Sequence, residues 1–151
     1  MINKIFKQNR DKILYNKFLG FLVKKGSKIG AKRILDKTFS KISNKTRFSR
    51  RTSLTRLFSI LNSFVEVKSV RVRRRFVLVP FSINLKRRSY LIVKWIMDAI
   101  KKKKKKKSSF SRKLGEEILS VLKGSFSRSK KSRDVNISKA MANRSNIHYR
   151  W

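Results

Sequence analysis

The sequence predicts a mainly α-helical protein, a single domain of about six helices with a two-stranded β-ribbon that protrudes between the third and fourth helices. Two observations carry this prediction. The chain has 151 residues, 40% of them hydrophobic, which suits one ordinary domain with a modest core. Apolar residues recur at helical spacing along most of the chain, and a clear strand pattern is found only within residues 64–88, FVEVKSVRVRRRFVLVPFSINLKRR.

The first two helices are predicted from apolar residues spaced three or four apart. The first is expected from Ile13 to Gly26, so residues 1–12 are predicted to form a basic tail before a domain over residues 13–151. Arg and Ser are too scarce in this tail for a transit peptide, and no cleaved leader is expected. The second helix is expected after Ser27, with an apolar stripe of Ala31, Ile34, Leu35, Thr38, Phe39 and Ile42.

A polar, basic connection over residues 44–51 is expected to lead into the third helix. Thr52 or Ser53 is predicted to cap that helix, because a hydroxyl oxygen can accept a hydrogen bond from a free N–H of the first turn. Its predicted core residues are Leu54, Leu57, Phe58 and Leu61.

Residues 64–83 form the predicted ribbon. Valines alternate with charged residues from Val65, and the alternation shifts by one at Lys68 and Ser69, so a β-bulge is expected there. An isolated hairpin is marginal in water, so this one must pack against the flanking helices while its tip reaches outward. Arginine binds phosphate with a planar fork, so we interpret the ribbon as a nucleic-acid finger. The alternative is that it is basic only because the whole chain is basic. Its cations are Lys68, Arg71, Arg73, Arg74 and Arg75.

A long fourth helix is expected after Asn84. Its first turn holds Lys86, Arg87 and Arg88, and cations there oppose the helix dipole. We therefore interpret them as ligands of an external anion, the alternative being that they point freely into solvent. Seven lysines over residues 101–107 repel one another at helical spacing, so the helix is expected to end there in a basic linker. The predicted apolar face is Leu85, Ile92, Trp95, Ile96, Ala99 and Ile100.

A fifth helix is expected from Ser108 or Ser109 to a stop at Gly124. Glu116 and Glu117 are adjacent, so they are predicted to be outward surface charges rather than a paired catalytic site. The residues predicted to face inward are Phe110, Leu114, Ile118, Val121 and Leu122.

Residues 125–133 are expected to be a basic, serine-rich loop that is mobile without a partner. A final helix is predicted with Asp134 in its first turn and a weak apolar face of Val135, Ser138, Met141, Ala142 and Ser145. After it, Tyr149 and Trp151 are expected either to stack on bases or to pack back onto that helix.

The charge of the chain indicates the class of its partner. Its 43 Lys and Arg against 7 Asp and Glu give a formal net charge of +36, which predicts a polyanion, either nucleic acid or an anionic membrane surface. No apolar run approaches the about 18 residues that a membrane span needs. Cysteine is absent and there is one histidine, so we predict no enzyme, no metal site and no cofactor.

Four short motifs resemble one known family, ribosomal protein seven of the small subunit. They are VEVKS at residues 65–69, VP at 79–80, RR at 87–88 and HYRW at 148–151, in the family's order, and the resemblance covers roughly residues 17–151. It implies a structural protein that binds small-subunit rRNA of the head (three-prime major) domain and helps to assemble the head. It also implies neighbouring ribosomal proteins of the head and platform as partners, and a ribbon near the exit-site tRNA and the mRNA path.

The resemblance also implies which residues bind rRNA. By position, Lys68, Ser69 and Arg71 match the first strand of the ribbon, and Asp134 lies beside the matching basic pair before the last helix. The family's usual Gly-Gly at the tip is replaced here by arginines, which leaves the turn type open. The full predicted rRNA-binding set is Lys24, Lys25, Lys28, Lys68, Ser69, Arg71, Arg73, Arg74, Arg75, Lys86, Arg87, Arg88, Lys130, Lys131, Arg133, His148, Tyr149, Arg150 and Trp151.

Composition indicates where the gene resides. An excess of Lys, Ile, Asn, Ser and Phe with little Ala and Gly is typical of an AT-rich organelle gene, so we expect a mitochondrial protein, with the plastid as the alternative. Two other functions stay open at this point. One is a histone-like architectural protein that binds organelle DNA non-specifically, and the other is a membrane-surface protein that uses the amphipathic second helix.

Overall fold

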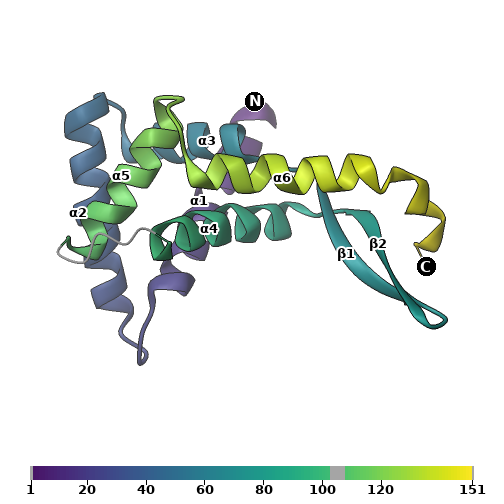
Figure 1. The fold of residues 1–151 in the computed structure, drawn as a ribbon. Coiled ribbons are helices and arrows are strands. Elements are labelled where there is room, and N and C mark those ends of the chain that lie inside the picture. The colour runs from purple at the N-terminus through teal and green to yellow at the C-terminus, as the bar shows by residue number, and fades with distance from the viewer. Residues whose placement is uncertain (1, 103–107, 151) are drawn as a thin grey trace.

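A computed structural model describes residues 2–102 and 108–150, with side chains described from residue 11 onward. Helices form a packed body, and a two-stranded ribbon projects from it between α3 and α4 (Figure 1), which confirms the predicted fold class. The elements are α1 (Ile2–Leu22), α2 (Lys28–Thr46), α3 (Arg50–Leu61), β1 (Val65–Val72), β2 (Arg75–Ser82), α4 (Leu85–Lys101), α5 (Phe110–Leu122), α6 (Arg128–Ala142) and the 3₁₀ helix η1 (Arg144–Tyr149).

The hydrophobic core lies among α1 to α5. Its largest fully buried apolar side chains include Phe18 of α1, Leu35 of α2, Leu57 of α3 and Ile96 of α4. Each side chain of this size contributes about 1.5–3 kcal/mol when it leaves water, so these contacts dominate the stability of the body. The predicted stripe of α2 is buried here except for half-buried Ile34, and is therefore not available to a membrane surface. None of the described helices is long and apolar enough to cross a bilayer.

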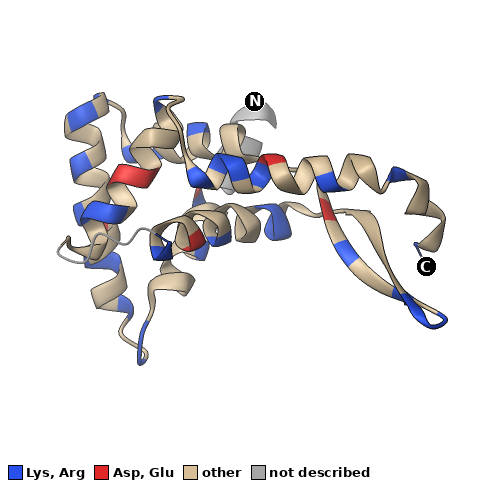
Figure 2. Cartoon of the chain, in the orientation of Figure 1, with Lys and Arg blue, Asp and Glu red and all other residues tan. Residues whose placement is uncertain are grey.

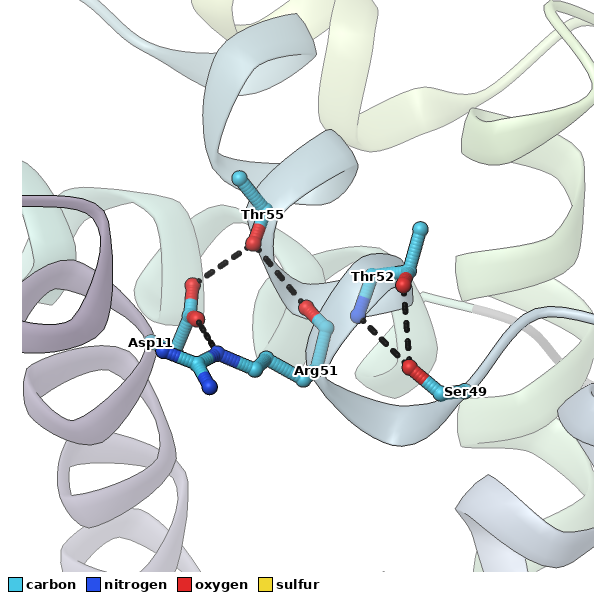
Figure 3. A network of polar contacts seen from close by, with 5 residues as sticks. All are labelled: Asp11, Ser49, Arg51, Thr52 and Thr55. Atoms are coloured by element: carbon cyan, nitrogen blue, oxygen red, sulfur yellow. Dashed lines mark hydrogen bonds and ion pairs between the residues drawn. The ribbon is translucent and has the colours of Figure 1, made fainter. Parts of the chain in front are cut away.

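Helix α1 begins at Ile2, before the predicted start at Ile13. A buried polar contact lies near its middle (Figure 3): Asp11, 8% exposed, accepts hydrogen bonds from Arg51 Nε at 3.1 Å and Thr55 Oγ1 at 2.8 Å. This tie to α3 gives the N-terminal part of α1 a tertiary partner that apolar periodicity could not reveal. Helical structure thus extends into the predicted basic tail.

The first turn of α3 is also earlier than predicted. Ser49 is the N-cap, and its hydroxyl accepts a hydrogen bond from the Thr52 backbone N–H at 3.2 Å (Figure 3). Neither Thr52 nor Ser53 caps the helix as expected, since both lie inside it and Ser53 is buried. The predicted connection over residues 44–51 accordingly shrinks to Arg47, Phe48 and Ser49.

The ribbon pairs in regular antiparallel register from Val65 opposite Ser82 to Val72 opposite Arg75. The predicted bulge at Lys68 and Ser69 is therefore wrong. The apolar residues change sides along the strand for another reason. At the base of the ribbon, Val67 faces the groove between α4 and α6. In the outer half, Val72 faces Tyr149 on the opposite side of the sheet. Each half thus places its valines on the side that another element covers.

Two predictions about the second half of the chain need correction. Glu117 does not point outward but is 1% exposed, and residues 127–133 are not a mobile loop, because α6 begins at Arg128 after the N-cap Ser127. Asp134 accordingly lies beyond the first turn. The carboxylate explains both: Glu117 Oε1 accepts hydrogen bonds from Ser127 Oγ at 2.9 Å, Ser129 Oγ at 2.8 Å and Ser129 N at 3.3 Å.

Helix α6 also presents a different face from the one predicted. It buries Ser129 and Ala140, whereas the predicted apolar residues Val135 and Met141 are 44% and 66% exposed. Helix α5 otherwise follows the prediction, with N-cap Ser109 and a left-handed Gly124 after its end, although Phe110 is exposed. Helix α4 ends at Lys101, as expected, and the remainder of the predicted linker, residues 103–107, lies outside the described residues.

Candidate nucleic-acid interface

Basic residues are spread over most of the molecule, and they are most concentrated at the outer end of the ribbon (Figure 2). The side chains of Arg71, Arg73, Arg74 and Arg75 are all exposed there. The turn itself is Arg73-Arg74, and only Arg73 of the two has a positive φ, +54°. This sign pattern is that of a type II′ turn, whose first central position favours glycine. The structure thus resolves the turn type that the replacement of Gly-Gly left open.

The base of the ribbon is fixed to α4 by a charged pair. Arg87 donates from Nε and Nη2 to the two carboxylate oxygens of Glu66, at 2.8 Å and 2.6 Å, and its guanidinium lies 4.8 Å from the Tyr90 ring centroid. These hydrogen bonds lower the pKa of Glu66 and raise that of Arg87. Bidentate geometry fixes direction as well as distance, so the pair sets the angle at which the ribbon leaves the body.

Arg88 braces the same junction. Its Nε donates to the Ile83 carbonyl at 3.0 Å, and its guanidinium lies 4.1 Å from the Phe64 ring centroid. The three cations in the first turn of α4 were interpreted as ligands of an external anion, with free exposure to solvent as the alternative. Arg87 and Arg88 have intramolecular partners, and only Lys86 of the three lacks a contact of this kind among the described residues. Contact of these three residues with RNA stays a prediction.

The C-terminal segment, which consists of η1 and Arg150, runs beside β2 of the ribbon (Figure 1). Asn146 Nδ2 donates to the Leu78 carbonyl at 3.1 Å, and Arg150 Nε donates to the Pro80 carbonyl at 2.6 Å. The ring of His148 packs 4.0 Å from that of Tyr149, centroid to centroid. A predicted member of the rRNA-binding set, Arg150, is therefore also a brace of β2.

An open cavity of about 730 Å³ lies between the ribbon tip and the C-terminal segment. It is lined by the three tip arginines, Val72, Val77 and Tyr149. Tyr149 thus lies at the edge of this cavity, on the side of the C-terminal segment that faces the ribbon tip. Trp151 lies outside the described residues.

Helix α6 carries the next group of predicted residues along the side of α4. Lys131 is exposed and Lys130 is half-buried. Arg133 donates from Nη1 to the Ile60 carbonyl of α3 and pairs with Asp134 at 2.5 Å. Asn136 Nδ2 donates to the Val65 carbonyl at 2.8 Å, so α6 also holds β1.

The structure therefore brings together some members of the predicted set and leaves others apart. The ribbon, the start of α4, α6 and the C-terminal segment are neighbours. Lys24, Lys25 and Lys28 lie in and beside the α1–α2 turn, at the other end of the molecule from the ribbon tip (Figure 1). Asn136 and Asn146, which brace the ribbon, were missed, because an asparagine in a polar stretch carries no signal of a distant carbonyl partner.

No cluster of three or more potential metal ligands is found in the described part of the chain. The arrangement instead offers exposed guanidinium and ammonium groups around a braced ribbon, with an aromatic ring at the edge of the cavity. Guanidinium groups suit phosphate oxygens and aromatic rings suit unstacked bases, so the chemistry of this surface is compatible with a nucleic-acid backbone and local stacking.

Comparisons with a family model and with individual proteins identify the same family. Residues 2–144 match a family model described as ribosomal protein S7p/S5e. A small ribosomal subunit protein uS7 from Thermosipho africanus is 30% identical over 139 residues, covering 92% of this chain and 88% of that protein. The uS7 protein of Nitrosococcus oceani is 32% identical over 135 residues, covering 89% and 85%. That of Wigglesworthia glossinidia brevipalpis is 30% identical over 138 residues.

Proposed function

Because the chain belongs to the ribosomal protein S7p/S5e family, and is therefore a structural protein of the small ribosomal subunit and not an enzyme, we propose that it binds the head domain of small-subunit rRNA and helps the head to assemble. Its partners are rRNA and other ribosomal proteins. The ribbon tip would lie near the exit-site tRNA and the mRNA path. The comparisons give no support to a histone-like protein that coats DNA.

One observation carries the proposal: the arginine-rich tip belongs to a ribbon that is fixed at its base and along β2. Glu66 and Arg87 hold the base, and Asn146 and Arg150 hold the carbonyls of β2. An unbraced two-stranded ribbon would be marginal in water. Bracing supports the recognition of a shaped RNA surface, because it presents the cations in one arrangement rather than many.

The test is a competition assay with a labelled head-domain rRNA transcript against shuffled RNA and generic duplex DNA, at two salt concentrations. We expect the transcript to survive a large excess of either competitor at the higher salt. Arg73→Ala with Arg74→Ala should reduce the slope of log affinity against log salt by about two, because each arginine is expected to neutralise one phosphate.

The matched control removes two exposed lysines of α2, Lys41→Ala with Lys45→Ala, which changes the net charge equally. If both double variants lose affinity equally, the ribbon carries no special role. If all three polymers compete equally at both salts, binding is non-specific and the proposal fails for the free protein.

We further propose that the protein acts in a mitochondrial ribosome. The support is compositional: the excess of Lys, Ile, Asn, Ser and Phe and the shortage of Ala and Gly suit an AT-rich organelle gene. Mass spectrometry of small subunits purified from isolated mitochondria and from isolated plastids tests this. Recovery of the protein with the plastid subunit alone would overturn the assignment.

A further inference from the structure

A hollow lined by apolar side chains opens where the end of α1, the start of α2, the last turns of α4 and the start of α5 meet. Its volume is about 320 Å³. This lies at the lower end of the roughly 300–1,000 Å³ range of ligand pockets, so the hollow suits one large side chain rather than a bulky molecule. Its apolar lining consists of Phe21, Leu22, Ala31, Ile34, Met97 and Phe110.

The rim of this hollow is positively charged. Lys24 lines it, and two further exposed lysines lie close by in the chain, Lys25 in the α1–α2 turn and Lys28 at the start of α2. The described residues that line the hollow include no acidic side chain. Lys25 and Gly26 have φ values of +49° and +76°, so the turn holds a lysine in the left-handed region, which non-glycine residues rarely adopt.

Apolar surface continues at the edge of the hollow. Ile29, which lies between the lining residues Ser27 and Gly30, is 69% exposed, and Phe110 is 36% exposed. The end of α1 and the start of α2, which line the hollow, lie far from the ribbon tip (Figure 1), so the hollow does not belong to the interface described above. An apolar hollow with exposed apolar residues beside it marks an interaction site.

We propose that this hollow docks an acidic segment of a neighbouring protein of the small subunit, which inserts one apolar side chain while its carboxylates meet Lys24, Lys25 and Lys28. Charge complementarity identifies the partner, because a carboxylate is the group that a rim of lysines attracts. The proposal deepens the proposed function by assigning one protein contact to a surface, and it rests on that function only for the partner's place in the particle.

The chemistry of the lining favours a protein side chain over an RNA base as the occupant. A base carries polar edges that need several hydrogen-bonding partners when buried, and the lining of the hollow is mainly apolar, with Lys24 and Ser27 as its polar side chains. An aliphatic or aromatic side chain needs none. RNA phosphates could contact the lysines, but they would leave the apolar hollow open to water. Lys24, Lys25 and Lys28 were predicted to bind rRNA, and the present assignment gives them a protein partner instead.

The test uses the full chain and two synthetic peptides of Asp and Glu with identical charge, one with a central Leu and one with a central Ser. Binding is followed by fluorescence anisotropy and by the NMR signal of the Met97 methyl group. Gly30→Leu places a side chain at the hollow, where a new Cβ meets only the rotatable Ser27 side chain, at 3.0 Å. Gly20→Leu is the matched control, because a Cβ there meets nothing within 4 Å.

We expect the Leu peptide to bind the wild type about tenfold or more tightly than the Ser peptide, in line with the burial of one large apolar side chain. Gly30→Leu should abolish this preference and Gly20→Leu should keep it. Lys28→Glu is a second variant outside the packed lining, and it should weaken both peptides alike. Equal binding of the two peptides to the wild type, or a preference that survives Gly30→Leu, overturns the proposal.

A hexauridylate probe tests the other class of occupant. If it shifts the Met97 signal and displaces the Leu peptide, the hollow is an RNA subsite and the proposal is wrong. The head-domain transcript is titrated against the same variants, and Gly30→Leu should bind it as the wild type does. Failure of the transcript to bind the wild type would refute the proposed function. The preference for the Leu peptide is a separate result and tests the docking proposal independently.

Discussion

Replacing Glu117 should melt the start of α6 before it affects the rest of the protein. The carboxylate is 1% exposed, and one of its oxygens accepts three hydrogen bonds from Ser127 and Ser129. Glu117→Ala removes the acceptor and leaves the buried polar groups of both serines without it. The same change opens a small cavity beside the core residues Leu114 and Ile118 of α5.

The magnitude follows from these contacts. A hydrogen bond to a charged group is worth about 1.5–3 kcal/mol, but three bonds that share one oxygen do not add independently. A buried donor left without its acceptor costs about 1–3 kcal/mol, and Glu117→Ala leaves donors of both Ser127 and Ser129 in this state, so we expect a cost of roughly 3 kcal/mol. Glu117→Gln keeps an oxygen in place and loses the charge, so its cost should be smaller, about 1–2 kcal/mol.

Urea unfolding in sulfate buffer measures the free energy, because sulfate screens the repulsion among the cations. Glu116→Gln is the control one residue away. Glu116 is 41% exposed and pairs with Arg112 at 3.2 Å, so its loss should change the free energy of unfolding by less than about 0.5 kcal/mol. Hydrogen exchange of the amides of residues 127–133 should accelerate in Glu117→Ala more than exchange in α3. If Glu117→Ala behaves like Glu116→Gln, or if exchange accelerates uniformly, the carboxylate does not hold α6.

Two further predictions concern the ribbon. Arg73→Gly should raise the free energy of unfolding by roughly 0.5–1 kcal/mol, because glycine adopts the observed φ of +54° without strain. Arg74→Gly, at negative φ, should lower the free energy of unfolding. Equal losses of stability for the two variants in urea unfolding would contradict the assigned turn. The pKa of Glu66 is lowered, chiefly by its hydrogen bonds from Arg87, so the stabilisation by this pair should be complete above the ordinary value of 4.5 and be lost as pH falls through the lowered value of the folded state. Arg87→Leu should flatten this part of the stability curve against pH, and an unchanged curve would show that the pair does not couple to folding.

Elements defined by apolar periodicity were well predicted from the sequence. The stripe of α2, apart from half-buried Ile34, and the core residues of α3 are buried as expected, and α4 ends where the lysine run begins. Burial of apolar side chains is a local consequence of spacing, so it can be seen one helix at a time. The existence of the ribbon was also predictable, because period-2 alternation and a cluster of arginines mark it.

What the sequence could not reveal depends on polar contacts across long separations. Glu117 was predicted to be exposed because carboxylates usually are, but two serines ten and twelve residues later supply donors that stabilise its burial. The same contact converted a predicted loop into the first turns of α6. The bulge was wrong for a related reason: the parity shift reflects which element covers each half of the ribbon, and that depends on where α6 and η1 lie.

The candidate interface shows how the cations divide between two tasks. Arg88, Arg133 and Arg150 each donate to a backbone carbonyl outside their own helix or segment, while the tip arginines are exposed around the turn. A guanidinium has five N–H donors. A guanidinium that donates to a carbonyl is fixed in direction by that hydrogen bond and keeps further N–H donors that can reach a phosphate. Substituting lysine at these three positions would keep the formal net charge of +36 and lose the planar fork. These three arginines therefore contribute to the arrangement of the candidate interface as well as to its charge.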